Sequence, residues 1–509
     1  MSWYRSDLLA GNHEFKAGFD HLFSWTKFRW DSRGGNGNYQ LVFNNGAPFQ
    51  INAWNYPVDP RNDANYVGLY AQDAWTIARR LTLNLGFRVA RDNAYAPEQC
   101  RVAGDFAPAE CWKKVQMNIF NSVAPRLHAA YDLFGDGKTV IKGGWGRFIH
   151  FREIITEVQP VAANNLAITT WRWRDENGNR NYDAGEVNLN PNGPDFVSLT
   201  GFVSGAGAIV NPDEKPPKSD QFDVTLEHEL PGGWAVRATG IYATNFDEYR
   251  VVEVDRPSSV YTIPVTNLDP GPDGRLGTAD DTGKSFTYYE FPTSLNGRAF
   301  SRTTLVNDPA ADQSYKTIEV AGSRRLAGGW QFSASYSATK FHVPFSCDHS
   351  SGAVNFVVRG CVATPNTEIN TSNDTWEWSG KISGAYILPY GITASANYDH
   401  RSGNPEARRV LFTGGRTIRS FLMNVEPVGS IRLPATNLID IRTAKRFSLG
   451  GGRSVEARLD VFNLMNFNTV LRRVLQSGST YLLPFTSGAN ASTAILLPRI
   501  VQVGATFAF

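Results

Sequence analysis

The stretch LTLNLGFRV, residues 81–89, places side chains of opposite character on alternate positions. Its odd-numbered residues are all apolar, and its even-numbered residues are Thr82, Asn84, Gly86 and Arg88. Successive side chains of a β-strand point to opposite faces of the sheet, so this is a strand with one apolar and one polar face. The apolar face either packs on a soluble core or meets lipid in a membrane barrel whose lumen the polar face lines.

The same period of two recurs from one end of the chain to the other. Apolar residues alternate with polar or small ones over residues 14–25, 221–227, 330–339, 376–386, 392–398 and 501–509. Such alternation is the main sequence signal of a strand, and nothing comparable indicates long helices. No apolar run approaches the roughly 18–20 residues of a membrane helix, whereas a transmembrane strand needs only about 10 alternating residues. We therefore expect an all-β chain.

Short and long connections alternate strictly between the expected strands. The short ones are supplied with turn residues such as Gly, Pro, Asn and Asp, and they fall at residues 10–12, 78–80, 134–138, 231–233, 327–329, 389–391 and 449–453. The long ones are polar and cover residues 31–64, 92–122, 152–217, 252–312, 344–373, 403–434 and 467–497. This order places all short turns on one rim and all long loops on the other, which is typical of an outer-membrane barrel.

The predicted fold is an all-β, antiparallel transmembrane β-barrel. Seven short turns join fourteen strands, and the last strand, about residues 499–509, makes fifteen, while residues 408–433 are expected to form extra strand within a loop. Bacterial single-chain barrels have an even number of strands, and the opening MSWYRSDLLAGNHEFK does not read as a signal peptide. Both observations favour a chain whose beginning is missing, with strands near 2–9 and 499–509 as open edges of the sheet.

Several segments resemble TonB-dependent receptors. They are GNHEFKAGFDHLF (11–23), YVGLYAQDAWTIARRLTLNLGFRVARDN (66–93), GKTVIKGGWGRF (137–148), NLIDIRTAKRFSLGGG (437–452), DVFNLMNFNTV (460–470) and the terminal VGATFAF. The nearest resemblance is to the Oar-like group, whose full-length members carry an N-terminal carboxypeptidase-regulatory-like domain. In this family a 22-stranded barrel surrounds a plug domain. With the plug domain absent, residues 1–509 resemble the C-terminal barrel portion, about 15 strands of 22, with long extracellular loops near 152–217 and 252–312.

The resemblance implies a receptor or transporter in the outer membrane of a Gram-negative bacterium, for TonB-coupled uptake or surface binding of a large ligand. Contact with the TonB system would run through the missing N-terminal part. Outer-membrane lipid is the expected partner of the apolar face, and the terminal Phe509 resembles the signal read by the barrel-assembly machinery. The alternatives are a passive outer-membrane porin, an outer-membrane adhesin or surface-binding protein, and a soluble β-rich carbohydrate-binding protein.

Enzymatic and nucleic-acid functions are not indicated. The net charge is +2 and 19% of residues are charged, so no basic field suggests a nucleic acid as partner. No HExxH, GxSxG, Walker A or dinucleotide-binding motif stands in a suitable context. The eight histidines, His150 among them, are scattered without metal-ligand spacing. Trp171 and Trp173 either stack on a ligand or, as we favour, pack locally or join an interfacial aromatic belt.

Two acidic loops are candidate calcium sites. Residues 175–186, DENGNRNYDAGE, have the oxygen-ligand spacing of an EF-hand-like loop, with ligands Asp175, Asn177, Asn179, Asn181, Asp183 and Glu186. Arg180 departs from the pattern, because position 6 is normally glycine, and three carboxylates predict weak affinity. Residues 269–281 offer Asp269, Asp273, Asp280 and Asp281 with a less regular spacing. The alternative for both loops is a solvated turn rich in Asn, Asp and Gly.

The four cysteines form two local pairs, Cys100 with Cys111 and Cys347 with Cys361. Four cysteines allow three pairings, and the local pairing needs the least chain closure. Two disulfides would imply an oxidising compartment. The alternative is four unrelated free thiols in loops.

Overall fold

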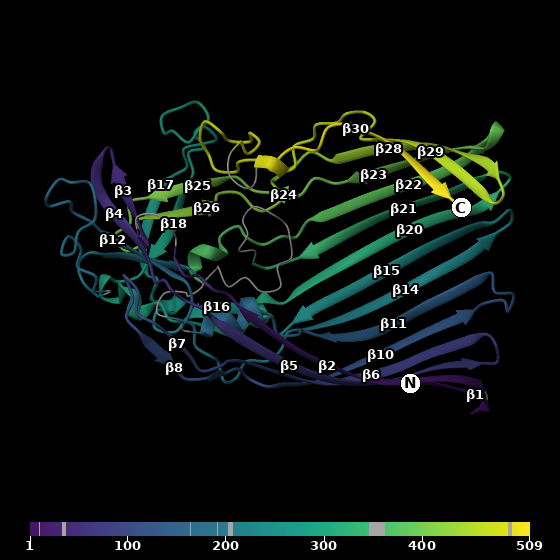
Figure 1. Ribbon diagram of the computed structural model, residues 1–509, viewed down its shortest axis with the longest axis horizontal. Coiled ribbons are helices and arrows are strands. Elements are labelled where there is room, and N and C mark those ends of the chain that lie inside the picture. The colour runs from purple at the N-terminus through teal and green to yellow at the C-terminus, as the bar shows by residue number, and fades with distance from the viewer. Residues whose placement is uncertain are drawn as a thin grey trace.

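Fifteen strands follow one another in a single antiparallel sheet of the computed structural model, and a sixteenth, β9 (Val115–Gln116), pairs with β6 (Figure 1). The structure describes residues 1–9, 11–32, 37–162, 164–190, 192–201, 207–345, 362–486 and 491–509. The predicted all-β, antiparallel fold is confirmed, with the predicted number of strands along the path. The path is β1 (Ser2–Leu8), β2 (Gly11–Lys27), β5 (Arg61–Ile77), β6 (Leu81–Ala96), β10 (Phe120–Asp132), β11 (Thr139–Ile149), β14 (Lys218–Leu230), β15 (Trp234–Phe246), β20 (Gln313–Ala327), β21 (Trp330–His342), β22 (Trp376–Leu388), β23 (Ile392–Arg401), β28 (Thr436–Gly450), β29 (Arg453–Phe462) and β30 (Ile500–Ala508).

The connections follow the predicted alternation. Each of the seven predicted short turns joins two consecutive strands of the path, from β1–β2 to β28–β29, and each predicted long segment joins the next pair. Figure 1 shows the short turns together at one end of the sheet and the long segments at the other. We call these ends the short-turn rim and the long-loop rim.

Strand register aligns the apolar faces and the polar faces of neighbouring strands, with exceptions such as Asp73 opposite Leu85 on the apolar face. On one face, Val224 of β14 lies between Gly143 and Gly240 of the adjacent strands. On the other face, the hydroxyl groups of Thr225 and Thr239 are 3.0 Å apart. A one-residue slip would exchange the two faces of a strand, so this pattern fixes the register. The apolar face is the one that a membrane barrel presents to lipid.

The sheet is strongly curved, and β1 and β30 are its outermost strands (Figure 1). Among the described residues these two strands do not pair with each other, so they are the open edges that the alternation predicts. Helices in the described part of the chain are short, and none is long and apolar enough to cross a membrane. They are η1 (Ile154–Val158), η2 (Gln159–Val161), η3 (Ser258–Val260), η4 (Thr293–Leu295), η5 (Arg298–Phe300), η6 (Pro309–Ala311), η7 (Pro365–Glu368), η8 (Pro389–Gly391) and η9 (Ala491–Thr493).

The long segments pack into structures of their own at the long-loop rim. In the first, which we call loop module 1, a sheet in the order β13 (Phe196–Gly201), β12 (Ala167–Arg172), β4 (Ala47–Trp54) and β3 (Tyr39–Asn44) joins two long segments. Its apolar core contains Ile51, Ala53, Trp171, Trp173 and Val187. Both tryptophans are buried, as the packing alternative predicted.

Loop module 2 combines the hairpins β17 (Ile263–Leu268)–β18 (Ser285–Glu290) and β25 (Arg409–Thr413)–β26 (Ser420–Asn424). They share a core of Tyr288, Val410, Phe412, Met423 and Val425. The extra strand expected within residues 408–433 is therefore present. The remaining strands at this rim pair two by two: β7 (Gln99–Arg101) with β8 (Glu110–Trp112), β16 (Tyr249–Glu253) with β19 (Thr303–Asn307), and β24 (Pro405–Glu406) with β27 (Ile431–Arg432).

Candidate functional site

The predicted calcium loop of residues 175–186 is attached to loop module 1 through its last acidic residue. Glu186 is buried and accepts a hydrogen bond from the indole N–H of Trp173, over 3.0 Å. Arg180 has a φ of 60°, the left-handed backbone that glycine normally supplies at position 6. Its N–H donates to Asp175 over 2.8 Å. The arginine therefore adopts the turn despite its side chain.

The side-chain oxygens of this loop take part in hydrogen bonds within the loop. Asp183 accepts from the side-chain amides of Asn177, over 2.8 Å, and Asn179, over 2.6 Å. These two bonds lower the pKa of the Asp183 carboxyl group. In the part of the chain that the structure describes, no group of three or more His, Cys, Asp or Glu side chains is arranged to hold a metal ion. Calcium binding here stays a prediction.

In the second acidic loop, residues 269–281, the carboxylates interact with different partners. Asp269 is buried and pairs with both terminal nitrogens of Arg408, at 2.8 and 2.5 Å. Asp280 accepts the backbone N–H of Asp273 over 2.8 Å, and Asp281 accepts that of Gly277 over 2.7 Å. Arg408 already supplies the positive charge beside Asp269. Calcium binding by this loop also stays a prediction.

One of the two predicted disulfides lies within the described residues. Cys100 of β7 is bonded to Cys111 of β8, and these residues face each other in the β7–β8 pair. Cys347 and Cys361 lie outside the described residues.

The polar face of the large sheet contains a hollow of about 870 Å³, lined by residues of β11 to β28 that include Glu227, Arg237, Ser335 and Lys381. Ion pairs cross from strand to strand around it: Arg237 with Glu319 at 2.5 Å, and Lys142 with Glu227 at 2.6 Å. Pairs of serine hydroxyl groups also bridge the strands, at 2.6 Å for Ser333–Ser383 and 3.0 Å for Ser337–Ser379. The wall therefore offers charges and hydroxyl groups to a hydrated solute.

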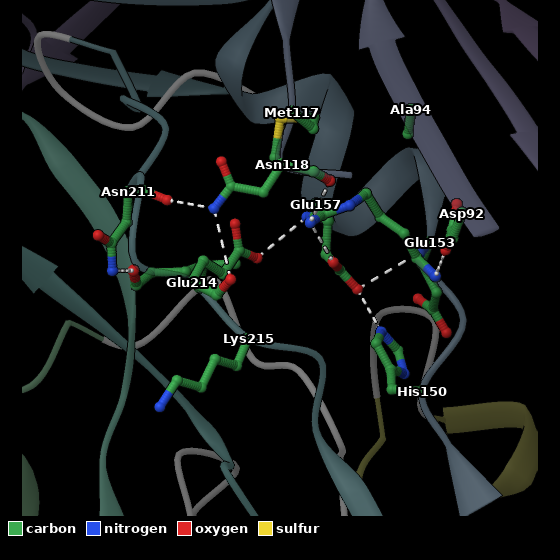
Figure 2. A network of polar contacts seen from close by, with 12 residues as sticks. Asp92, Ala94, Met117, Asn118, His150, Glu153, Glu157, Asn211, Glu214 and Lys215 are labelled. Atoms are coloured by element: carbon green, nitrogen blue, oxygen red, sulfur yellow. Dashed lines mark hydrogen bonds and ion pairs between the residues drawn. The ribbon is translucent and has the colours of Figure 1, made fainter. Parts of the chain in front are cut away.

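A buried ionic network, which we call the Arg152 cluster, joins strand ends at the long-loop rim (Figure 2). Its members are Asp92, Asn118, His150, Arg152, Glu157 and Glu214. The Arg152 side chain is completely buried, and its Nη1 lies 3.1 Å from Glu157 and 3.0 Å from Glu214. His150 Nε2 lies 2.5 Å from the other oxygen of Glu157. The cluster thus contains four buried ionisable residues: Asp92, Arg152, Glu157 and Glu214.

Side chains of the Arg152 cluster also form hydrogen bonds with main-chain groups of neighbouring segments. The backbone N–H of Arg152 donates to Asp92 of β6 over 2.8 Å. Asn118, just before β10, donates from its amide to the carbonyl oxygens of Asn211 and Pro212, at 2.7 and 3.1 Å. The guanidinium of Arg152 also lies 4.1 Å from the ring centre of Phe120. The cluster therefore fixes the exit of β11 and the approach to β14 against β6 and β10.

The short helix η1 completes the cluster and is of the π type, which often marks functional positions. It carries Glu157 on one side and places Val158 in an apolar cluster with Ala64, Ala94 and Met117. Asp92 is an even-numbered residue of β6, on the same face as Asn84 and Arg88. The cluster therefore lies on the polar side of the sheet, at its long-loop rim.

Sequence analysis did not predict this cluster. Its residues are spread from Asp92 to Glu214, and the topology of the sheet brings them together. The available signal was weak: FREIITE, residues 151–157, places charged residues among apolar ones without strand alternation. No spacing rule links such a segment to Glu214.

Comparisons with known proteins agree with this geometry. A model of the family described as "Outer membrane beta barrel domain" matches residues 6–400. The TonB-dependent transporter Oar of Myxococcus xanthus is 24% identical, over 90% of this chain and 42% of its own length. The outer membrane transporter YddB of Escherichia coli has a similar fold, with a TM-score of 0.51 at 12% identity, covering 99% of this chain and 52% of that one. The chain thus spans about half the length of these relatives, and both are named as transporters rather than enzymes.

Proposed function

The chain belongs to the outer membrane β-barrel domain family, and from this membership we propose that it forms the wall and outer surface of a TonB-dependent transporter that takes up a large ligand. Proteins of this family lie in the outer membrane of Gram-negative bacteria, and so does this chain. The identity of the ligand, its uptake and the coupling to TonB are parts of the proposal.

The observation that carries the proposal is the strict separation of the two rims. All seven short turns lie at one rim, and all seven long segments lie at the other. In outer-membrane barrels the long loops face the cell exterior. Residues 152–217 and 252–312 are thus extracellular in this proposal. Loop modules 1 and 2 have buried apolar cores, so they offer shaped surfaces to a ligand arriving from outside.

The composition of the polar face supports a role of the sheet as the wall of a passage for solutes. The hollow of about 870 Å³ is lined by charged and hydroxyl-bearing side chains of several neighbouring strands. These groups can exchange hydrogen bonds with the hydration shell of a passing solute. The apolar face, by contrast, suits only lipid or another apolar surface.

Uptake by living cells tests the proposal against its two membrane alternatives. A strain that lacks the gene and a complemented strain are grown in the same medium, and mass spectrometry follows which large medium components are depleted. We expect depletion of at least one such component to require the gene and to stop when an uncoupler removes the proton-motive force. Depletion that continues with the uncoupler would favour a passive porin. Loss of surface attachment with unchanged depletion would favour an adhesin.

A further inference from the structure

The charges buried in the Arg152 cluster do not balance without His150. Arg152 contributes one positive charge, while Glu157 and Glu214 contribute two negative charges, and the side chains of all three are at most 1% exposed. An uncompensated buried charge is costly, because protein interiors solvate ions poorly. His150 is the group that touches Glu157, at 2.5 Å, and its side chain is 17% exposed. A protonated His150 makes this group of four neutral. The fifth ionisable member of the cluster, Asp92, is also buried, and an ionised Asp92 would add a further negative charge that only strengthens the need for a positive one.

His150 is surrounded by further titratable groups from several elements. Glu153 and Arg152 lie on its own segment, and Asp92 approaches from β6. Glu248 lies in the connection between β15 and β16, and Tyr249 is the first residue of β16, with its ring 6.2 Å from the imidazole in an edge contact. Glu248 is buried, so its ionisation would add another negative charge beside the cluster. The surroundings of His150 therefore favour its positive form.

We propose that the Arg152 cluster is a proton-linked anchor, which holds residues 150–158 against β6 and the approach to β14 while His150 is protonated and releases them when it loses its proton. Releasing this segment frees the start of the long connection between β11 and β14 at the mouth of the lumen. The anchor affects the stability of one segment and is independent of the ligand that the proposed transporter takes.

The electrostatics of two groups give the direction of the effect. Burial lowers the pKa of His150, but the hydrogen bond and the charge of Glu157 outweigh it, so this pKa is raised above 6.5. Burial raises the pKa of Glu248 to about 7. A group whose pKa is raised in the folded state contributes stability at low pH and loses it as pH rises through that folded pKa. Both groups therefore weaken the anchor as pH rises, Glu248 between about 4.5 and 7 and His150 above 6.5.

Amide hydrogen exchange on the full chain in detergent micelles tests the anchor. Peptides covering residues 150–158 are followed between pH 5 and 8.5, with exchange times corrected for the intrinsic rate. In the wild-type protein we expect protection to fall by about tenfold per pH unit where the anchored state holds one more proton than the released state. Protection that stays constant over this range would overturn the proposal.

Two substitutions have opposite expected results. With His150→Gln the positive charge is lost, so protection should be lower than in the wild type at pH 5, and only the change that Glu248 causes below about pH 7 should remain. With Glu157→Gln the remaining Arg152–Glu214 pair is neutral without His150, so protection at pH 8 should be higher than in the wild type. A wild-type pH profile in either variant would contradict the charge argument even if wild-type protection changes with pH.

A matched control comes from His342, which pairs with Asp374 at 2.7 Å but has a side chain that is 53% exposed. His342→Gln removes an imidazole–carboxylate pair without changing any buried charge. It should leave the exchange profile of residues 150–158 as in the wild type. A profile altered as strongly as that of His150→Gln would show a global effect and refute the local anchor.

Discussion

A lysine placed on the two faces of one strand tests which face of the sheet meets lipid. Ala396 and Asn397 are the fifth and sixth of the ten residues of β23. Ala396 lies between Gly384 and Ile441, on the apolar face, while Asn397 lies between Ser383 and Asp440, on the polar face. Ala396→Lys and Asn397→Lys therefore add the same charge at nearly the same depth, but on opposite sides.

The expected cost follows from the position of Ala396 along the strand. With a rise of about 3.3 Å per residue and a tilt of about 40°, each residue advances about 2.5 Å along the membrane normal. Five residues place Ala396 about 13 Å from the short-turn rim, near the middle of an apolar band about 25 Å tall. A lysine at that depth costs about 2–4 kcal/mol. Asn397→Lys should change the unfolding free energy by less than about 0.5 kcal/mol, since its ammonium faces the Asp440 carboxylate.

The measurement is equilibrium unfolding in urea of protein folded into phospholipid vesicles, followed by tryptophan fluorescence. Equal costs for the two variants, or a larger cost for Asn397→Lys, would refute the assignment of the faces. Lysines at Leu85 and Asn84 would test the faces less directly. Leu85 lies directly opposite Asp73, so a lysine at position 85 would gain an ion-pair partner that masks part of the cost of facing lipid.

Three further results are expected. Replacing Arg408 by alanine leaves Asp269 buried without its partner, so loop module 2 should lose about 3–5 kcal/mol of local stability, seen as faster amide exchange in β25; unchanged exchange would contradict this. Reducing the Cys100–Cys111 bond should destabilise the β7–β8 loop by about 3 kcal/mol and speed its proteolysis without changing the unfolding of the sheet. Millimolar calcium should slow proteolysis of residues 175–186 in the wild type but not in Glu186→Gln; equal cleavage with and without calcium would reject the predicted site.

Sequence alternation was sufficient to predict the large sheet. Each strand of the path pairs with its neighbours along the path, so local turns such as 78–80 and 231–233 determine both topology and register. The apolar and polar faces follow from the same alternation, because side-chain direction in a strand has a period of two. Segments of about ten residues are therefore sufficient to predict these features, without any knowledge of contacts between residues that are far apart in the sequence.

The structures at the long-loop rim could not be predicted in this way. Asp269 and Arg408 are 139 positions apart, and Arg152 and Glu214 are 62 apart. Such partners are close together only because the strand order of the sheet places their loops at the same rim. An ion pair between distant residues also leaves no periodic pattern in the sequence. The predicted calcium loops show a related difficulty. Spacing along the sequence identified the candidate ligands, but it could not indicate that Asp269 forms an ion pair with the distant Arg408.

Loop module 1 also constrains the order of events during folding. Its central strands β4 and β12 contain Asn52 and Thr170, whose side chains are bonded across 118 positions of sequence. Contacts at such separation form slowly, because the intervening chain must first be brought to order. The hairpins β5–β6 and β10–β11 lie within that interval and close through short turns. We therefore expect these hairpins to form first, and a kinetic experiment should find Trp171 and Trp173 reaching their buried environment only after the surrounding strands have paired.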